Sequence, residues 1–376
     1  MNQPLTHPLE FRGSGSEYAK IYFVNLALSI ITLGIYSAWA KVRNKRYFHG
    51  NTLIDGNSFD YHAQPLQILK GRLLVVGFFI LYNVAIGYMP LLGFAFLVLF
   101  LLALPWLVLK SKQFNMRNTS YRQIRFDFSG SLGKLFLYYV IMPIGSVLTL
   151  GLMHPYTVFK QREYIANSTI FGRSPFFFKG DVGTFYQTYI IVILASSLFM
   201  FAIMALVIAI AAFLGDGGSF LEGFKEAFAH KQVQELVSSA ASQPDSKTLS
   251  KTYLAAVYAA IGGFYAFMII ISLAATTYIN TRITNHIFNN LKLSFVRFKM
   301  DIRFWKLLGI HLSNIFLILL TLGVYLPWAK VRVVRYKLSC VIVYAADLEQ
   351  FVASETEQTK ALGEEMSDFL DVDIGF

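Results

Sequence analysis

The sequence predicts an all-α polytopic membrane protein with three internal repeats, four long transmembrane helices and short cytoplasmic β-hairpins. Composition is the first observation behind this class: 55% of the 376 residues are hydrophobic and 15% are charged, whereas soluble domains carry about 25% charged residues. The second observation is a set of segments without Asp, Glu, Lys, Arg or His, each close to or above the roughly 18 residues that cross a bilayer. These segments are 73–89, 91–109, 189–214 and 253–277.

The third observation is a motif that occurs three times. Residues 32–47 read TLGIYSAWAKVRNKRY, residues 321–336 read TLGVYLPWAKVRVVRY, and residues 149–164 hold the weaker copy TLGLMHPYTVFKQREY. The copies align without gaps beyond the motif, so that Asn25 corresponds to Asn314. A register shared over so many positions indicates internal duplication.

The basic residues of the connecting segments predict the orientation of the chain. The positive-inside rule places four segments rich in Lys and Arg in the cytoplasm. The turn at 87–90, which has no basic residue, and the longer segment 215–252 are expected outside. Both termini then lie in the cytoplasm. The four cytoplasmic segments are 41–72, 110–134, 160–187 and 282–306.

This orientation makes each repeat enter and leave the membrane on the same side. Each repeat is therefore expected to form a re-entrant helical hairpin that bends at the glycine of its Thr-Leu-Gly, sheltered by the four long helices. The alternative is seven full crossings, which leaves one or more basic loops outside. A third arrangement, a helix lying flat at the interface, is disfavoured because residues 21–31 have no polar face.

Short alternating segments after the basic stretches predict two-stranded β-hairpins that join into a small cytoplasmic β layer. One example is Asn51-Thr-Leu-Ile-Asp-Gly followed by Phe59-Asp-Tyr61. The predicted organisation has six parts: repeat 1 with an apolar hairpin and a β-hairpin (1–72), a transmembrane helix pair (73–110), repeat 2 with cytoplasmic strands (111–187), a helix pair with the external loop 215–252 (188–281), repeat 3 (282–346) and an acidic mobile tail (347–376).

The TLG-Y--WAKVR--RY motif and the Asn-Thr…Phe-x-Tyr phrase make the chain resemble the YjgN family of bacterial inner-membrane proteins. The resemblance extends from Phe11 to about Tyr344, and the middle copy departs from it at Met153, Tyr156 and Glu163. It implies a multi-pass protein of the bacterial inner membrane. The family is a domain of unknown function, so the resemblance implies no substrate, cofactor or catalytic residue.

Polar and basic side chains near the apolar segments are the candidate functional residues. An Asn or His inside an apolar segment can face a pathway, although hydrogen bonding to a neighbouring helix or a structural histidine is the simpler explanation. The basic clusters can gather around a mouth that attracts an anion, or they can set topology and contact anionic lipid. The candidates for a pathway or lipid contact are Asn25, Gly34, Arg43, Arg46, Gly151, Arg162, His311, Asn314, Gly323, Arg332 and Arg335.

The sequence predicts no enzyme, no cofactor and no metal site. Cys340 is the single cysteine, and no catalytic or nucleotide-binding motif is present. The net charge of +11 is assigned to basic loops at the membrane rather than to nucleic-acid binding. The expected partners are the bilayer, its anionic phospholipids and an unknown small solute. The expected function is a channel or transporter for a small anionic solute, and the alternative is a non-transporting protein that organises the envelope or binds anionic lipid.

Overall fold

The computed structural model of the protein describes residues 5–213, 246–346 and 348–356. Most of the predicted external loop 215–252, and the acidic tail beyond residue 356, lie outside these ranges. The chain divides into two compact units, one formed by residues 187–280 and the other by residues 1–186 together with 281–376. Within the first of these units, the rings of Phe199 and Phe267 stack with centroids 5.1 Å apart.

Ten short strands form a closed antiparallel β-barrel, so the expected all-α fold is wrong. Four hairpins lie side by side, and β1 pairs with both β10 and β2 to close the ring. Closure pairs every edge strand, which a separate hairpin cannot do. The strands are β1 (Leu5–Phe11), β2 (Thr52–Ile54), β3 (Asn57–Tyr61), β4 (Thr119–Tyr121), β5 (Ile124–Phe128), β6 (Thr169–Phe171), β7 (Ser174–Phe178), β8 (Leu291–Leu293), β9 (Val296–Met300) and β10 (Val341–Ala345).

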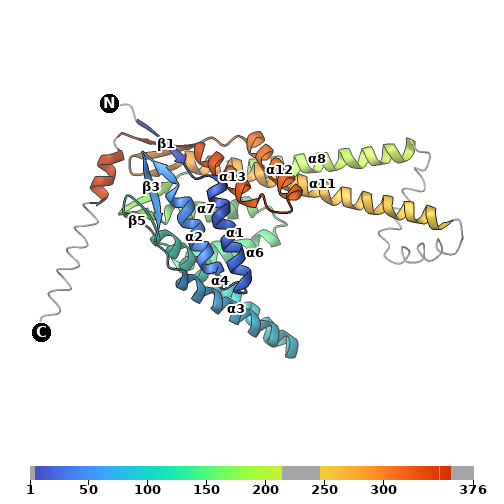
Figure 1. The fold of residues 1–376 in the computed structure, drawn as a ribbon, viewed down its shortest axis with the longest axis horizontal. Coiled ribbons are helices and arrows are strands. Elements are labelled where there is room, and N and C mark those ends of the chain that lie inside the picture. The colour runs from blue at the N-terminus through green and yellow to red at the C-terminus, as the bar shows by residue number, and fades with distance from the viewer. Residues whose placement is uncertain (1–4, 214–245, 347, 357–376) are drawn as a thin grey trace. The chain divides into compact units, whose positions relative to one another are not determined.

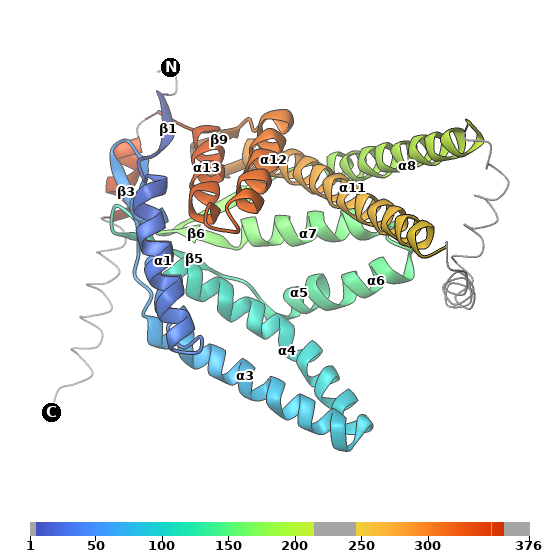
Figure 2. The same ribbon diagram turned by 45° about the vertical axis from the view of Figure 1, so that its right-hand side comes forward.

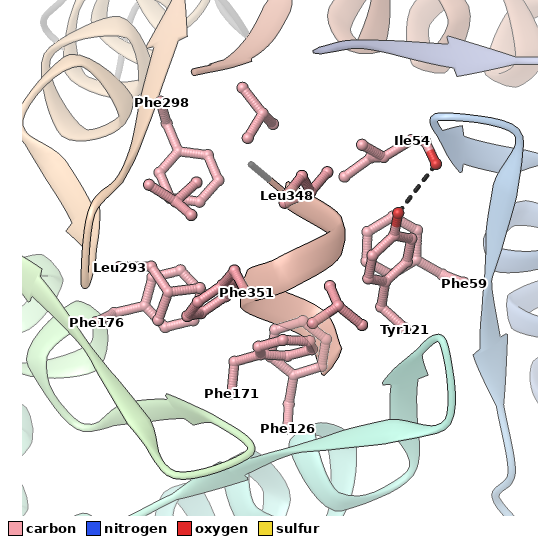
Figure 3. A pocket seen from close by; sticks show the side chains of 13 residues that line it. Ile54, Phe59, Tyr121, Phe126, Phe171, Phe176, Leu293, Phe298, Leu348 and Phe351 are labelled. Carbon is pink, nitrogen blue, oxygen red and sulfur yellow. Dashed lines mark hydrogen bonds between the residues drawn. The ribbon is translucent and has the colours of Figure 1, made fainter. Parts of the chain in front are cut away.

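The barrel interior is apolar and holds a helical segment, residues 348–356 (Figure 3). Aromatic side chains of the strands, among them Phe171, pack against Phe351 of this segment with ring centroids 6.2 Å apart. The hydroxyl of Tyr121 donates a hydrogen bond to the carbonyl oxygen of Ile54 at 3.0 Å. A cavity of about 90 Å³ remains beside the segment. No pattern in the sequence predicted a helix at this position.

The helices come in pairs that alternate with the strands (Figure 1). Four of them contain a stretch long and apolar enough to cross a membrane: Pro65–Tyr88, Pro90–Arg117, Val182–Ile203 and Phe267–Asn289. These four stretches, found in the part of the chain that the structure describes, overlap the four predicted apolar windows, the last of them over residues 267–277. The helices are α1 (Gly15–Ile31), α2 (Ser37–Gly50), α3 (Pro65–Tyr88), α4 (Pro90–Arg117), α5 (Leu132–Phe136), the π-helical turn η1 (Leu137–Ile141), α6 (Met142–Leu148), α7 (His154–Asn167), α8 (Val182–Phe213), α11 (Ser246–Asn289), α12 (Phe304–Leu320) and α13 (Leu326–Ser339).

Local sequence explains where several of these helices begin. Ser14 caps α1 through a capping box, in which its hydroxyl accepts from the Glu17 amide and Glu17 accepts from the Ser14 amide. Helices α3, α4, α7 and α13 each have a proline in the first turn, where the missing amide hydrogen is not needed.

Each helix pair starts and ends at the barrel. The β2–β3 hairpin connects α2 to α3, β4–β5 connects α4 to α5, β6–β7 connects α7 to α8, and β8–β9 connects α11 to α12. The four basic segments that the sequence assigns to one side of the membrane carry these hairpins. They therefore meet in a single barrel.

Candidate functional site

The three motif copies form three short helical hairpins: α1–α2, α6–α7 with the preceding α5 and η1, and α12–α13 (Figures 1 and 2). In each turn the leucine and the glycine of Thr-Leu-Gly have left-handed backbones. The φ values are 49° and 90° at Leu33 and Gly34, 51° and 87° at Leu150 and Gly151, and 50° and 90° at Leu322 and Gly323. The glycine therefore takes an angle that other residues rarely adopt.

The threonine of each motif closes its turn. Its hydroxyl accepts a hydrogen bond from the amide four residues later, at 2.9 Å for Thr32, 3.2 Å for Thr149 and 3.0 Å for Thr321. The leucine side chains at the tips are 94–95% exposed. Each hairpin therefore presents an exposed leucine at a turn that the threonine hydroxyl and backbone hydrogen bonds close.

The tyrosine that ends each motif ties the second helix to the start of the first. Tyr47 donates to the Ser14 carbonyl at 2.8 Å, and Tyr164 donates to the Ser131 carbonyl at 3.1 Å. In the third hairpin the Arg303 amide donates to the Tyr336 hydroxyl at 3.0 Å. The spacing that the three copies share is thus explained by the geometry of a closed hairpin.

Asn25 and Asn314 each contact the returning helix of their own hairpin. Asn314, 4% exposed, donates to the Ala329 carbonyl at 3.2 Å and accepts from the Arg332 guanidinium at 2.9 Å. Asn25, also 4% exposed, donates to Asn44 at 3.2 Å. Its side-chain oxygen, Oδ1, has no donor among the described residues. The hydrogen bonds of the two asparagines are thus made within separate hairpins.

The second arginine of the motif binds backbone beside the barrel. Arg46 donates to the carbonyl oxygens of Tyr61 and Ala63 at 3.2 and 3.3 Å, and Arg335 donates to the Gly13 carbonyl at 2.8 Å. These contacts hold the helix against the linker between strand and helix. Both arginines have a structural partner, which the sequence did not reveal.

Arg43 and Arg162 are exposed on α2 and α7, and His311 is half-buried on α12. Ion pairs of arginine or lysine in the described ranges are Arg12–Glu10, Arg117–Asp127, Arg122–Glu349 and Lys160–Glu163. Neither Arg43 nor Arg162 is among them. Their charges are therefore available to an anion from outside the hairpin.

Two lysines outside the predicted set of candidate residues join neighbouring elements. Lys45 donates to the hydroxyl of Tyr61 at 3.3 Å and to Asn115 of α4, and burial, with Lys41 nearby, lowers its pKa. Lys330 lies over the ring of Phe48 at 4.8 Å and donates to the Tyr18 hydroxyl at 3.1 Å. Lys45 and Lys330 both lie within the motif, but their partners come from other parts of the chain.

The relatives that the comparisons with known proteins give include two of moderate identity. The chain is 33% identical over 142 residues to the inner membrane protein YjgN of Salmonella typhimurium, and 32% identical over 148 residues to that of Escherichia coli K12. These matches cover 37% and 39% of this chain. The chain thereby spans only 35% and 37% of the length of the two relatives. No solved structure matches the chain.

The sequence model of a whole family extends much further along the chain. The family described as bacterial protein of unknown function (DUF898) matches residues 6–369. This confirms the predicted resemblance to YjgN, and the four apolar helices together with the named relatives support a membrane location. The chain belongs to the DUF898 family of bacterial proteins.

Proposed function

We propose that this protein is a non-enzymatic, multi-pass protein of the bacterial inner membrane that binds anionic phospholipid around its three short hairpins. One observation carries the proposal: each exposed apolar tip is followed along the returning helix by basic side chains. Arg43 and Arg162 are exposed cations of this kind with no carboxylate partner in the described chain. Lipid phosphates supply the missing negative charge.

The lengths of the short hairpins support insertion from one side. Helices α1 and α2, with 17 and 14 residues, are about 25 and 21 Å long at ~1.5 Å per residue. The hydrocarbon core is about 30 Å thick. Arg43 lies about 9 Å along α2 from its first residue. A tip that dips into one leaflet and returns leaves Arg43 near the head groups, whereas a full crossing buries it in hydrocarbon.

The barrel and both described ends of the chain are proposed to lie in the cytoplasm. The basic segments between the helix pairs all carry barrel strands, and basic loops remain on the cytoplasmic side. Strand β1 near the N-terminus and residues 348–356 near the C-terminus belong to the same barrel. Sidedness of the barrel therefore determines the sidedness of both.

A channel or transporter for a small anionic solute is the alternative, and it draws on the same cations and the glycine-interrupted helices. The asparagines suggested for its pathway bond inside their own hairpins. This favours lipid binding over permeation.

The experiment compares lipids on purified full-length protein. Phosphatidylglycerol and phosphatidylcholine are titrated into nanodiscs, and the thermal midpoint and the lipid retained in native mass spectrometry are measured. Selective stabilisation by phosphatidylglycerol that weakens with salt is expected. Equal effects of the two lipids, with anion flux through protein-containing vesicles, would refute lipid binding in favour of the channel.

A further inference from the structure

The first basic residue shared by the three motif copies has a different partner in each hairpin. Arg43, Lys160 and Arg332 occupy corresponding positions, each about 9 Å along its helix from the first residue. Lys160 lies 2.7 Å from the Glu163 carboxylate, and Arg332 lies 2.9 Å from the carbonyl oxygen of Asn314. Arg43 is exposed and has no hydrogen bond or ion pair within the described chain. Of these three cations, Arg43 alone is free there.

The first hairpin also contains the asparagine that binds the arginine in the third hairpin, but its side-chain oxygen accepts no hydrogen bond. Asn25 corresponds to Asn314, and both are buried on the outgoing helix of their hairpin. In the third hairpin the asparagine oxygen accepts from Arg332, but in the first hairpin the same oxygen has no donor. A buried acceptor without a donor is unfavourable. The hydrogen bond between arginine and asparagine that is formed in the third hairpin is therefore absent from the first.

The two pairs share a stacked Tyr–Trp pair and the same turn. Tyr36 and Trp39 stack with centroids 6.1 Å apart and planes at 10°, and Tyr325 and Trp328 stack at 6.0 Å and 14°. The Leu-Gly turns also have nearly the same backbone angles. The two hairpins differ instead in how the asparagine is bonded: its amide nitrogen donates to Asn44 in the first hairpin and to the Ala329 carbonyl in the third, and only in the third does its oxygen accept from the arginine.

We propose that Arg43 is the exchangeable phosphate-binding residue of the protein, an inference that rests on the proposed lipid-binding function. Its guanidinium alternates between the Asn25 oxygen and the phosphate of an anionic phospholipid. Guanidinium groups bind phosphate oxygens through paired, charge-assisted hydrogen bonds. Lys160 and Arg332 are withheld from the lipid by Glu163 and Asn314. Among the three corresponding cations, the exchangeable contact with lipid is accordingly that of the first hairpin.

The test compares matched variants of the full chain in phosphatidylcholine nanodiscs, with phosphatidylglycerol as the probe. Arg43→Gln is expected to weaken phosphatidylglycerol binding by about tenfold, the effect of one charge-assisted hydrogen bond. Arg332→Gln is expected to change it by less than about twofold, and instead to lower the thermal midpoint. Undiminished binding in Arg43→Gln, or equal losses in the two variants, would overturn the inference.

A second pair of variants tests the exchange itself. Asn25→Leu removes the internal competitor and is expected to tighten phosphatidylglycerol binding, because more of the protein then presents a free Arg43. Asn314→Leu releases Arg332 and is expected to add a second retained lipid. Weaker binding in Asn25→Leu, with a thermal midpoint in phosphatidylcholine like that of the wild type, contradicts the exchange.

The outcomes separate this inference from the proposed function. If the wild type does not prefer phosphatidylglycerol, the proposed function itself fails. If the wild type prefers it and Arg43→Gln does so equally, only the role of Arg43 fails. Stabilisation by inorganic phosphate alone, lost in Arg43→Gln, would assign the site to free phosphate and overturn the lipid assignment.

Discussion

Tyr121 is a titratable residue inside the barrel, and its buried hydroxyl makes the stability of the fold depend on pH. Burial raises the pKa of its hydroxyl to about 12, whereas an unfolded tyrosine has a pKa of about 10. Because the folded pKa is the higher one, the stabilising contribution is complete below about pH 10 and is lost as the pH rises towards about 12. We expect the thermal midpoint to fall more steeply over this range in the wild type than in Tyr121→Phe. Tyr88→Phe, at a position that is 86% exposed, should keep the wild-type slope, and equal slopes in all three proteins would contradict the prediction.

Glu355 holds the helical segment 348–356 in the barrel. Its carboxylate accepts from the Arg173 amide at 2.7 Å and from the Ser174 hydroxyl at 2.5 Å, and the residue is 4% exposed. Glu355→Ala leaves both donors without this acceptor. We therefore expect the free energy of unfolding to fall by about 1–3 kcal/mol. The matched control is Glu349→Ala, because the Glu349 side chain is 82% exposed and 3.4 Å from Arg122. That change should cost less than about 1 kcal/mol, and equal losses measured by chemical denaturation would count against the buried anchor.

At the scale of the element, the motif specifies a hairpin. The threonine, the glycine and the final tyrosine each have one local task, and the task is the same in all three copies. This is why the sequence alone predicted a bend at the glycine. The partners of Arg46, Arg335, Lys45 and Lys330 could not be predicted, because they come from linkers and helices that the fold brings to each hairpin separately.

Two glycines of the third hairpin give an element-scale prediction. Gly323 has a φ of +90°, which a side chain rarely adopts, so Gly323→Ala should destabilise the hairpin by about 1–3 kcal/mol. Gly309 lies inside α12 with open space around the position of a Cβ. Gly309→Ala should therefore be neutral or stabilising by up to about 1 kcal/mol. The thermal midpoints of the two variants are measured in the same detergent. An equal loss of stability in Gly309→Ala would show that helix packing, and not the turn, causes the effect.

At the scale of the whole molecule, the sidedness of the barrel and of the hairpin tips is the main prediction. In a Cys340→Ser background, single cysteines replace exposed Lys292 on β8, Tyr88 at the end of α3 and Leu322 at a hairpin tip. With an impermeant maleimide, intact cells should label Tyr88→Cys only, because the barrel faces the cytoplasm and the tip lies in hydrocarbon. Inverted vesicles should label Lys292→Cys only. Label at Leu322→Cys in intact cells would instead show a full crossing by that hairpin.

The sequence by itself determined the parts of this protein that depend on neighbouring residues. Long apolar windows, Thr-Leu-Gly bends and short alternating strands each arise from local composition and spacing, and the sequence located all three. Only the tertiary structure decided that the strands close into one barrel around residues 348–356, and that Arg43 is free while Arg332 is bound. Strand closure joins segments separated by whole helix pairs, and a side chain in two like motifs takes whichever partner its surroundings supply. Such long-range pairings leave no periodic trace in the chain.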